Sequence, residues 1–377
     1  MSTKDFQFII IGSGVIGLAI ARSLAEYGYK SVLVIDKNEK IGQGISSRNS
    51  EVIHSGIYYP PRSLKAKYCI RGRQLLYDFC DKQAVWLRKT GKLIVANNNQ
   101  LTELKKLYHN AIQNGINDVK IIDDFEINEL EPNIKADKGL LINCSGILCA
   151  HELMNAFHRI SINQGHDYLF KTEVISSKII SEGYKTEIKN SYGEIESVTS
   201  QWIINCGGLN SDVIARYIQK NSNLPFITFS KGCYFKLSSN WRNKFKHLVY
   251  PIPDKKNGGL GIHLSYDKDG YAKLGPNAKW LKNKEENYEV EETLKDIFFE
   301  EASKYILGLS KDEISPDYSG IRPKIKSSTR LFSDYYIQHE KNKGYPNWVN
   351  LIGIESPGLT SAIAIGDDIV ENIIMIS

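Results

Sequence analysis

The N-terminal segment of the chain places a glycine-rich turn between an apolar run and a helical stretch. Residues 6–11 are apolar and predict a buried strand, and the helical stretch that follows continues to about Tyr27 and ends at Gly28. A second apolar run, residues 31–35, predicts another buried strand. This order of elements is typical of a βαβ unit, so we expect a parallel sheet covered by helices.

The turn of this unit has the glycine spacing of a dinucleotide site. Gly12 permits a tight turn, Gly14 lets the backbone approach a pyrophosphate, and Gly17 lets the helix pack closely on the strand. The helix N-terminus offers free N–H groups and a positive dipole end to phosphates. Asp36, at the end of the second strand, is expected to accept hydrogen bonds from a ribose. The motif predicts a bound dinucleotide and does not choose between FAD and NAD.

Length and composition are those of a folded protein of about two domains. The chain has 377 residues, of which 42% are hydrophobic and 24% charged. These values argue against a disordered chain, a collagen and a coiled coil. No apolar stretch is long enough to span a bilayer, which argues against an integral membrane protein.

The charge balance is mildly basic. Lys and Arg number 48 against 43 Asp and Glu, for a formal net charge of +5, and the two signs are interleaved. A dedicated nucleic-acid binder has a denser basic face, so we expect no nucleic-acid partner. A peripheral contact with an anionic membrane surface and the capture of an acidic substrate both stay open. The N-terminus has no secretory or transit pattern, which predicts a cytoplasmic protein.

The six cysteines follow neither a disulfide nor a metal pattern. No C-x-x-C occurs, and Cys144 and Cys149 are the closest pair. We expect reduced thiols and no metal site.

Periodicity along the rest of the chain predicts further helices, strands and turns. The predicted helices are 63–82, 99–114, 151–164, 288–306 and 359–374. The predicted strands are 91–96, 171–180, 184–189, 194–205 and 348–354, within a pattern that is also β-rich over 226–276. The predicted turns are 190–193, 255–258, 267–270 and 355–358. Because both ends of the chain have a strand, a glycine turn and a helix, we expect one discontinuous domain with a second domain inserted into it.

The segment from Ser46 to Pro61 is dense in hydrogen-bond donors and too polar for a core strand. Its run Ser-Arg-Asn-Ser-Glu-Val-Ile-His-x-Gly-Ile-Tyr-Tyr, residues 47–59, resembles the FAD-dependent L-2-hydroxyglutarate dehydrogenase/oxidase family. That family belongs to the flavoproteins that resemble D-amino-acid oxidase. Further matching motifs occur in the same order at 64–66, 91–96, 205–209, 250–253, 261–264, 275–278, 320–324 and 350–361. The match is weak over 97–145, 160–200 and 279–315.

The resemblance implies a mixed α/β fold with two domains. A Rossmann-like FAD-binding domain with a β-meander would comprise residues 1–85, 145–220 and 316–377. An inserted antiparallel-sheet domain for the substrate would comprise residues 86–144 and 221–315.

The resemblance also implies a set of residues that hold FAD without a covalent link. Ser47, Arg48 and Asn49 would lie along the pyrophosphate and the flavin edge. The meander near 171–205 would lead into Gly207 and Gly208, which resemble a second backbone contact to the dinucleotide. The turn with Gly358, Leu359 and Thr360 would bring a helix N-terminus to the flavin ring, where its dipole stabilises the anionic reduced flavin.

The catalytic candidates are His54, His263 and Arg322. An alcohol carbon gives up hydride well only if its hydroxyl proton is removed, and a neutral imidazole suits that role near neutral pH. An α-carboxylate needs a cationic clamp, and arginine offers two parallel donors. Arg322, between Gly320-Ile321 and Pro323, is expected in a stiff turn. The sequence does not decide which histidine is the base.

Tyrosines and further cations are candidates for substrate binding. Tyr58, its neighbour Tyr59, and Tyr250 have hydroxyl groups that can donate to a carboxylate, although buried tyrosines also occur as packing residues. A five-carbon dicarboxylate needs a second clamp, for which Lys65, Arg71 and Lys231 are equal candidates.

Together these features predict FAD-dependent oxidation of a 2-hydroxy acid, with L-2-hydroxyglutarate giving 2-oxoglutarate by hydride transfer to the flavin. The electrons would then pass to O₂, a quinone or another carrier. The alternatives are a glycine or sarcosine type of amine oxidase, a glycerol 3-phosphate dehydrogenase, and a non-catalytic flavoprotein subunit.

Overall fold

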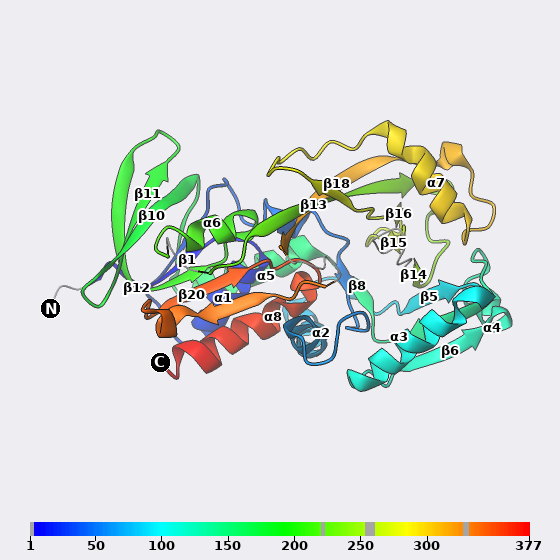
Figure 1. Cartoon of the computed structure of the whole chain (residues 1–377), viewed down its shortest axis with the longest axis horizontal. Coiled ribbons are helices and arrows are strands. Elements are labelled where there is room, and N and C mark those ends of the chain that lie inside the picture. The colour runs from blue at the N-terminus through cyan, green and yellow to red at the C-terminus, as the bar shows by residue number, and fades with distance from the viewer. Residues whose placement is uncertain (1–3, 220–222, 253–260, 327–331) are drawn as a thin grey trace.

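The computed structural model describes residues 4–219, 223–252, 261–326 and 332–377. The turn predicted at 255–258 lies outside these residues. Two large sheets lie beside each other along the long axis of the molecule (Figure 1). The described part of the chain has no helix with the length and apolar character needed to cross a membrane.

The first sheet has a parallel core in the order β9-β2-β1-β12-β20. The core strands are β1 (Phe6–Ile11), β2 (Val32–Ile35), β9 (Asp167–Leu169), β12 (Ile195–Asn205) and β20 (Trp348–Ile352). Antiparallel strands extend it: β10 (Thr172–Ile180) and β11 (Gly183–Asn190) form a meander with β12, and β19 (Tyr336–His339) pairs with β20. The predicted βαβ unit and the meander are confirmed.

The parallel core of this sheet is covered on both faces. Successive side chains of a strand point to opposite faces, so both sets of side chains are buried. Phe8 and Ile10 of β1 pack with apolar residues of α1 (Val15–Glu26) and α8 (Gly358–Ile369). Ile9 and Ile11 pack on the other face with residues of the meander and of α6 (Ser211–Ala215). The helices α2 (Leu64–Gln83) and α5 (Ala150–Asn163) pack against α8 and α1.

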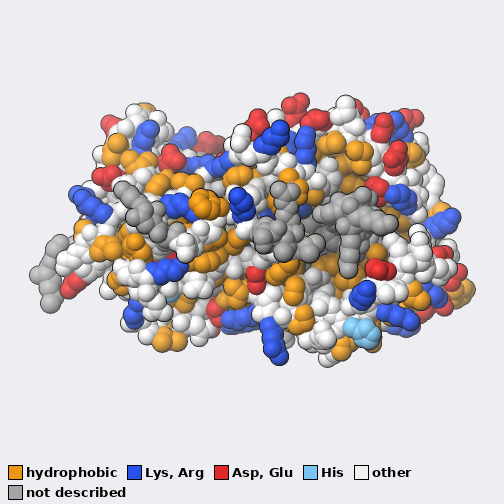
Figure 2. Space-filling model, in the orientation of Figure 1, with side chains coloured by type: hydrophobic (Ala, Val, Ile, Leu, Met, Phe, Trp, Pro, Cys, Tyr) orange, Lys and Arg blue, Asp and Glu red, His pale blue; other side chains and the backbone are white. Residues whose placement is uncertain are grey.

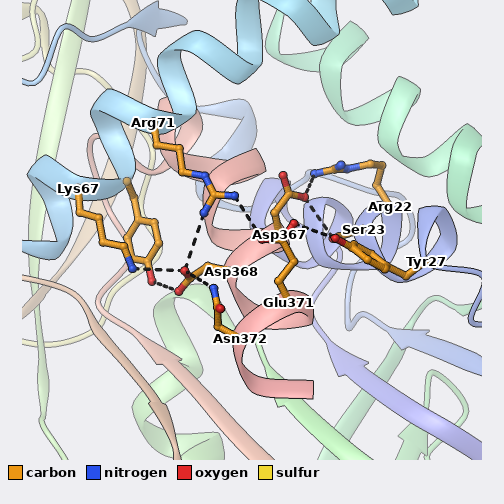
Figure 3. Close-up of polar contacts among 10 residues, drawn as sticks. Arg22, Ser23, Tyr27, Lys67, Arg71, Asp367, Asp368, Glu371 and Asn372 are labelled. Atoms are coloured by element: carbon orange, nitrogen blue, oxygen red, sulfur yellow. Dashed lines mark hydrogen bonds and ion pairs between the residues drawn. The ribbon is translucent and has the colours of Figure 1, made fainter. Parts of the chain in front are cut away.

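Carboxylates of α8 connect the three neighbouring helices α1, α2 and α8 (Figure 3). Asp367 accepts from the buried guanidinium of Arg22 on α1 at 2.6 Å, and Asp368 accepts from the Tyr68 hydroxyl of α2 at 2.6 Å. Glu371, in the π-helical turn Val370–Ile374 that continues α8, accepts from Tyr27, the residue that follows α1, and from Arg71 of α2. These contacts fix the C-terminal end of the final helix against its two neighbours.

The second sheet has the strand order β17-β13-β16-β15-β14-β5-β7-β6, with β18 paired to β13. Its strands are β5 (Lys92–Ala96), β6 (Val119–Asp123), β7 (Lys138–Ile142), β13 (Ile227–Leu237), β14 (Leu248–Pro251), β15 (Leu264–Tyr266), β16 (Ala272–Leu274), β17 (Lys279–Leu281) and β18 (Ile314–Ile325). The helices around it are α3 (Leu101–Gln113), α4 (Asp124–Leu130) and α7 (Lys295–Ser303). A small third sheet contains β3 (Val52–Ile53), β4 (Leu87–Arg88) and β8 (Gly146–Leu148).

The prediction of a turn around Arg322 is wrong, because this residue lies in the long strand β18. Gly320 and Pro323, on the two sides of Arg322, made this segment look like a turn. Among the described residues β18 pairs only with β13, and at such an edge the missing N–H of proline is tolerated. The helix predicted over 288–306 is confirmed only as α7 and a short 3₁₀ turn before it, Glu292–Leu294.

Strand β18 joins the second sheet although residues 316–325 fall in the segment 316–377 predicted for the first domain. The division of the chain into two domains stays a prediction. On the face shown in Figure 2, Lys and Arg side chains are interspersed with Asp and Glu side chains, as the interleaved sequence suggests.

Candidate active site

A cavity of 510 Å³ is lined by both sheets and by the loops between them. It is bordered by the β1–α1 turn, the end of β2, the segment from 43 to 54, the turn after β12, the strands β13, β14 and β18, and the start of α8. Residues far apart in the sequence therefore meet at one cavity, and most of the predicted site residues are among them.

The β1–α1 turn is so close to neighbouring backbone that only glycine fits. Gly12 has a φ of +106°, and a Cβ on it would lie 2.5 Å from the carbonyl oxygen of Cys206. A Cβ on Gly17 would lie 1.9 Å from the carbonyl oxygen of Gly12, so this glycine brings α1 against the turn. Gly12 and Gly14 line the cavity. A pyrophosphate can thus approach the backbone at the start of α1.

Asp36 lies at the end of β2 and lines the same part of the cavity. Its carboxylate accepts two hydrogen bonds of 2.7 Å from the backbone N–H and the hydroxyl of Ser13. The backbone and side-chain amides of Asn38 donate to its other oxygen at 2.9 and 3.0 Å. These four donors fix the carboxylate as an acceptor at the cavity wall.

The residues of the polar segment after β2 do not all line the main cavity. Arg48 and Asn49 line the cavity, whereas Ser47 lines a separate cavity of 440 Å³. Ser46, which the sequence analysis did not single out, lines the main cavity and accepts a 2.9 Å hydrogen bond from the N–H of Val15 at the start of α1. Its position beside Ser47 in a donor-rich run was the only available signal.

The glycines after β12 and the start of α8 close the cavity from two other directions. Gly207 and Gly208 line it directly after the meander ends, and Gly358 and Leu359 line it at the N-terminus of α8. Thr360 is fully buried instead. Its hydroxyl accepts from the N–H of His54 at 3.0 Å and donates to a β3 carbonyl, so it joins α8 to the strand that precedes His54.

Two imidazoles line the cavity. His54 is partly exposed, and its Nε2 lies 3.3 Å from the Ser356 hydroxyl. His263 is 4% exposed and stacks on the Tyr250 ring with centroids 3.6 Å apart. Burial lowers the pKa of both imidazoles well below the ordinary value, and the ammonium group of Lys92 lowers it further. Both rings are therefore neutral near pH 7 and can accept a proton.

Arg322 lies on β18, and its guanidinium reaches the cavity beside Gly232 of the neighbouring strand β13. Its Nη2 donates to the Asn277 carbonyl at 2.6 Å. A Cβ on Gly232 would lie 2.2 Å from that Nη2, so the missing side chain of this glycine makes room for the guanidinium. Arg322 also contributes to the low pKa of His263, after burial and the charges of Lys92 and His54. The guanidinium of Arg322 and the imidazoles thus belong to one electrostatic site.

The tyrosines and the remaining cations differ in their access to this site. Tyr250 lines the cavity, whereas Tyr58 does not, and the buried hydroxyl of Tyr58 has no hydrogen-bond partner among the described residues. None of the three candidates for a second clamp lines the cavity. Lys65 pairs with Glu355 at 2.7 Å, Arg71 with Glu371 at 3.3 Å, and Lys231 donates to the Glu289 carbonyl at 2.6 Å.

A glycine turn that leaves room for a pyrophosphate, a fixed carboxylate that can accept from a ribose, and neutral imidazoles beside an arginine are features of a nucleotide-dependent oxidoreductase. The chain belongs to the DAO family of FAD dependent oxidoreductases, whose model matches residues 7–372. The described residues fit FAD, because the two glycine turns, Asp36 and the start of α8 border one continuous cavity.

Relatives and solved structures agree with this assignment. The chain is 35% identical to a mitochondrial L-2-hydroxyglutarate dehydrogenase of Arabidopsis thaliana, over 96% of this chain and 82% of that protein. It is 28% identical to the L-2-hydroxyglutarate dehydrogenase of Escherichia coli K12, over 98% and 93% of the two chains. A FAD-bound L-alpha-glycerophosphate oxidase of Mycoplasma pneumoniae has a TM-score of 0.86 and 27% identity over 98% and 94% of the chains. A glycine oxidase of Geobacillus kaustophilus has a TM-score of 0.79 at 17% identity, over 98% and 95%, and shares the fold.

Proposed function

We propose that the protein oxidises a 2-hydroxy acid, L-2-hydroxyglutarate, to 2-oxoglutarate. The observation that carries this proposal is that His54, His263 and Arg322 line one cavity with the glycine turns, Asp36 and the start of α8, which we propose hold FAD. The names of the relatives over almost the whole chain support the same substrate.

The oxidation removes one hydride and one proton from the substrate, and different groups of the site accept them. FAD, when bound, supplies the acceptor for the hydride that leaves the substrate carbon. We assign the hydroxyl proton to His54, because its ring is partly exposed in the cavity while His263 is almost covered. As the proton moves to the imidazole and the hydride leaves, the C–O single bond becomes a carbonyl. Ser356, at 3.3 Å from Nε2, orients the His54 ring.

Arg322 is proposed to bind the α-carboxylate. Its Nη2 is already held by the Asn277 carbonyl, so the guanidinium keeps one orientation while its remaining N–H groups are available to a carboxylate. Tyr250 is proposed as an additional contact from the cavity wall, whereas Tyr58 lies outside it.

The charge of the site favours a hydroxy acid over an amine. The carboxylate of Glu355 lines the cavity, but it is paired with the ammonium groups of Lys65 and Lys324, both at 2.7 Å. Lys92 and Arg322, two of the charged groups that act on His263, are basic, and they repel an ammonium substrate. A glycine type of oxidase is therefore the weaker candidate.

A glycerol phosphate is a second candidate substrate, because the 27% identical Mycoplasma pneumoniae structure is an L-alpha-glycerophosphate oxidase. A phosphate also needs a cationic clamp, which Arg322 and Arg48 offer at the cavity. The identity to the hydroxyglutarate dehydrogenases is higher, at 35% over 96% of this chain, and it decides our order of preference.

We also propose that the protein acts in the cytoplasm, that it passes its electrons to O₂ or to a quinone or other carrier, and that its FAD is not covalently attached. All six cysteines are free, which supports a reducing compartment. Measuring O₂ consumption beside quinone reduction, with and without vesicles of anionic lipid, tests the acceptor and the membrane contact.

The test of the reaction is an anaerobic titration of the purified holoprotein, followed by the visible flavin spectrum. L-2-hydroxyglutarate is compared with its D-enantiomer, glycine, sarcosine and glycerol 3-phosphate. We expect bleaching by the L-hydroxy acid. Bleaching by glycine, sarcosine or glycerol 3-phosphate alone would replace the substrate, and an unchanged flavin with every compound would favour a non-catalytic subunit. His54→Gln is expected to slow bleaching by 10²-fold or more, about the usual contribution of a general base, and His263→Gln by less.

A further inference from the structure

Lys92 is a buried cation that the proposed reaction does not use. It is the first residue of β5, it is 0% exposed, and its Nζ has no hydrogen-bond partner among the described residues. An unpaired ammonium group is costly to bury, so this lysine calls for a functional reason. The visible signal in the sequence is a lysine that begins an otherwise apolar strand.

The second sheet places Lys92 beside the two aromatic rings of the site. The strands β15, β14 and β5 are consecutive neighbours in this sheet. Val249 pairs with Leu264 in antiparallel register, so the next pair is Tyr250 and His263. On the other side of β14, Leu248 pairs with Lys92 in parallel register. Because the side-chain period of a strand is two, Lys92 and Tyr250 point to the same face of the sheet.

The distances show that the Tyr250 ring separates the two basic groups. The His263 ring is stacked on Tyr250 with an interplanar angle of 14° and a centroid distance of 3.6 Å. The Nζ of Lys92 lies 3.9 Å from the same centroid, which is too close for a position beside the ring edge. The imidazole occupies one face of the phenol ring, so the ammonium group occupies the other. The electron-rich ring binds a cation on that face.

A second proton on this stack is unfavourable. If His263 were protonated, two cations would lie on the two faces of one buried ring, where little water screens their repulsion. The charge of Lys92 therefore favours the neutral imidazole. Burial lowers the pKa of Lys92 to about 7, although the neighbouring thiols of Cys69 and Cys144 act to raise it. Lys92 is still protonated below that pH, in the range in which the histidines would take up protons.

The other titratable groups around the stack do not replace this charge. His54 and Arg322 also lower the pKa of His263, but their effects are smaller than those of burial and of Lys92. The phenols that act on Tyr250, those of Tyr58, Tyr234 and Tyr305, are neutral because burial raises the pKa of each of them.

We propose that Lys92 is a positioning residue of the oxidation, whose charge behind the Tyr250 ring keeps His263, and through the shared site His54, neutral and ready for the hydroxyl proton. The proposal rests on the proposed function in one respect only, namely that an imidazole of this site accepts that proton. The proton state of the imidazoles themselves can be observed without any substrate.

The direct test is an NMR pH titration of the FAD-bound protein with labelled histidine, in which His54→Gln and His263→Gln assign the two signals. In Lys92→Met we expect the titration midpoint of His263 to rise by roughly one pH unit, the smaller end of the effect of a close charge. Lys92→Arg keeps the charge and should leave the midpoint low. Lys273→Met is the matched control, because Lys273 is also a buried lysine of this sheet and lies 5.7 Å from a tyrosine ring, that of Tyr318.

A midpoint in Lys92→Met equal to that of the wild type would overturn the proposal. If Lys92→Met does not retain FAD, Lys92→Gln takes its place with the same expected shift. The functional readout is the pH dependence of anaerobic flavin reduction, whose acidic limb should move to higher pH in Lys92→Met and stay in place in Lys92→Arg and Lys273→Met. An NMR shift without flavin reduction by any 2-hydroxy acid would refute the proposed reaction alone, whereas normal reduction without an NMR shift would refute the role of Lys92 alone.

Discussion

The buried carboxylate of Glu355 offers a quantitative test of how the turn before α8 is held. Glu355 is 7% exposed, and one of its oxygens accepts from Lys65 and Lys324 at 2.7 Å each. Burial raises the pKa of this carboxyl group, but the ammonium groups of Lys65 and then Lys324 outweigh burial and hold the pKa at about 2, below the ordinary 4.5. At about 1.4 kcal/mol per pKa unit, the charged form contributes about 3 kcal/mol to the free energy of unfolding.

The substitution Glu355→Gln keeps the shape of the side chain and removes its charge, which leaves Lys65 buried without a counter-ion. We expect the free energy of unfolding to fall by about 3 kcal/mol at pH 7, close to the usual cost of removing one partner of a buried ion pair. The pKa of Glu355 is lower in the folded protein than in the unfolded chain. Its contribution is therefore complete above pH 4.5 and is lost as the pH falls toward about 2.

The assay is urea unfolding at saturating FAD, followed by tryptophan fluorescence, from pH 7 down to pH 3. The stability of the wild type and of Glu355→Gln should differ most at pH 7 and converge in acid, while the exposed control Glu196→Gln should match the wild type throughout. A difference at pH 7 of less than about 1 kcal/mol, or a difference that does not shrink in acid, would refute the reasoning, since such values are typical of exposed ion pairs.

Three further predictions concern the cavity and its support. In Gly232→Ala the new Cβ would lie 2.2 Å from Nη2 of Arg322, so we expect a tenfold or larger loss of kcat/KM with unchanged FAD content. An unchanged kcat/KM would contradict this prediction. In Gly12→Ala the Cβ would lie 2.5 Å from the Cys206 carbonyl at a positive φ, so the purified protein should contain little FAD, which its visible spectrum measures. Arg22→Met leaves two carboxylates of α1 and α8 without their partner, and thermal unfolding should detect a loss of roughly 3 kcal/mol, whereas an unchanged Tm would show that the charges of these helices are solvated.

The local part of the site was predictable from the sequence. The βαβ unit, the glycine turn and Asp36 depend on residues close together in the chain, whose apolar runs and backbone requirements are visible in the printed order. The meander and the start of α8 were predicted for the same reason. The resemblance to a known family then placed most of the remaining site residues at one cavity.

The rest depends on which strands become neighbours. Lys92, Tyr250 and His263 lie in three segments whose adjacency follows from the order of the second sheet, and no local pattern states that order. Arg322 looked like part of a turn because Gly320 and Pro323 lie on either side of it, and only its place at the sheet edge makes the strand possible. The sequence by itself therefore determined the cofactor fold and the types of residue in the site. The tertiary structure decided which of them share a buried environment, because charge, burial and proton affinity depend on neighbours in space.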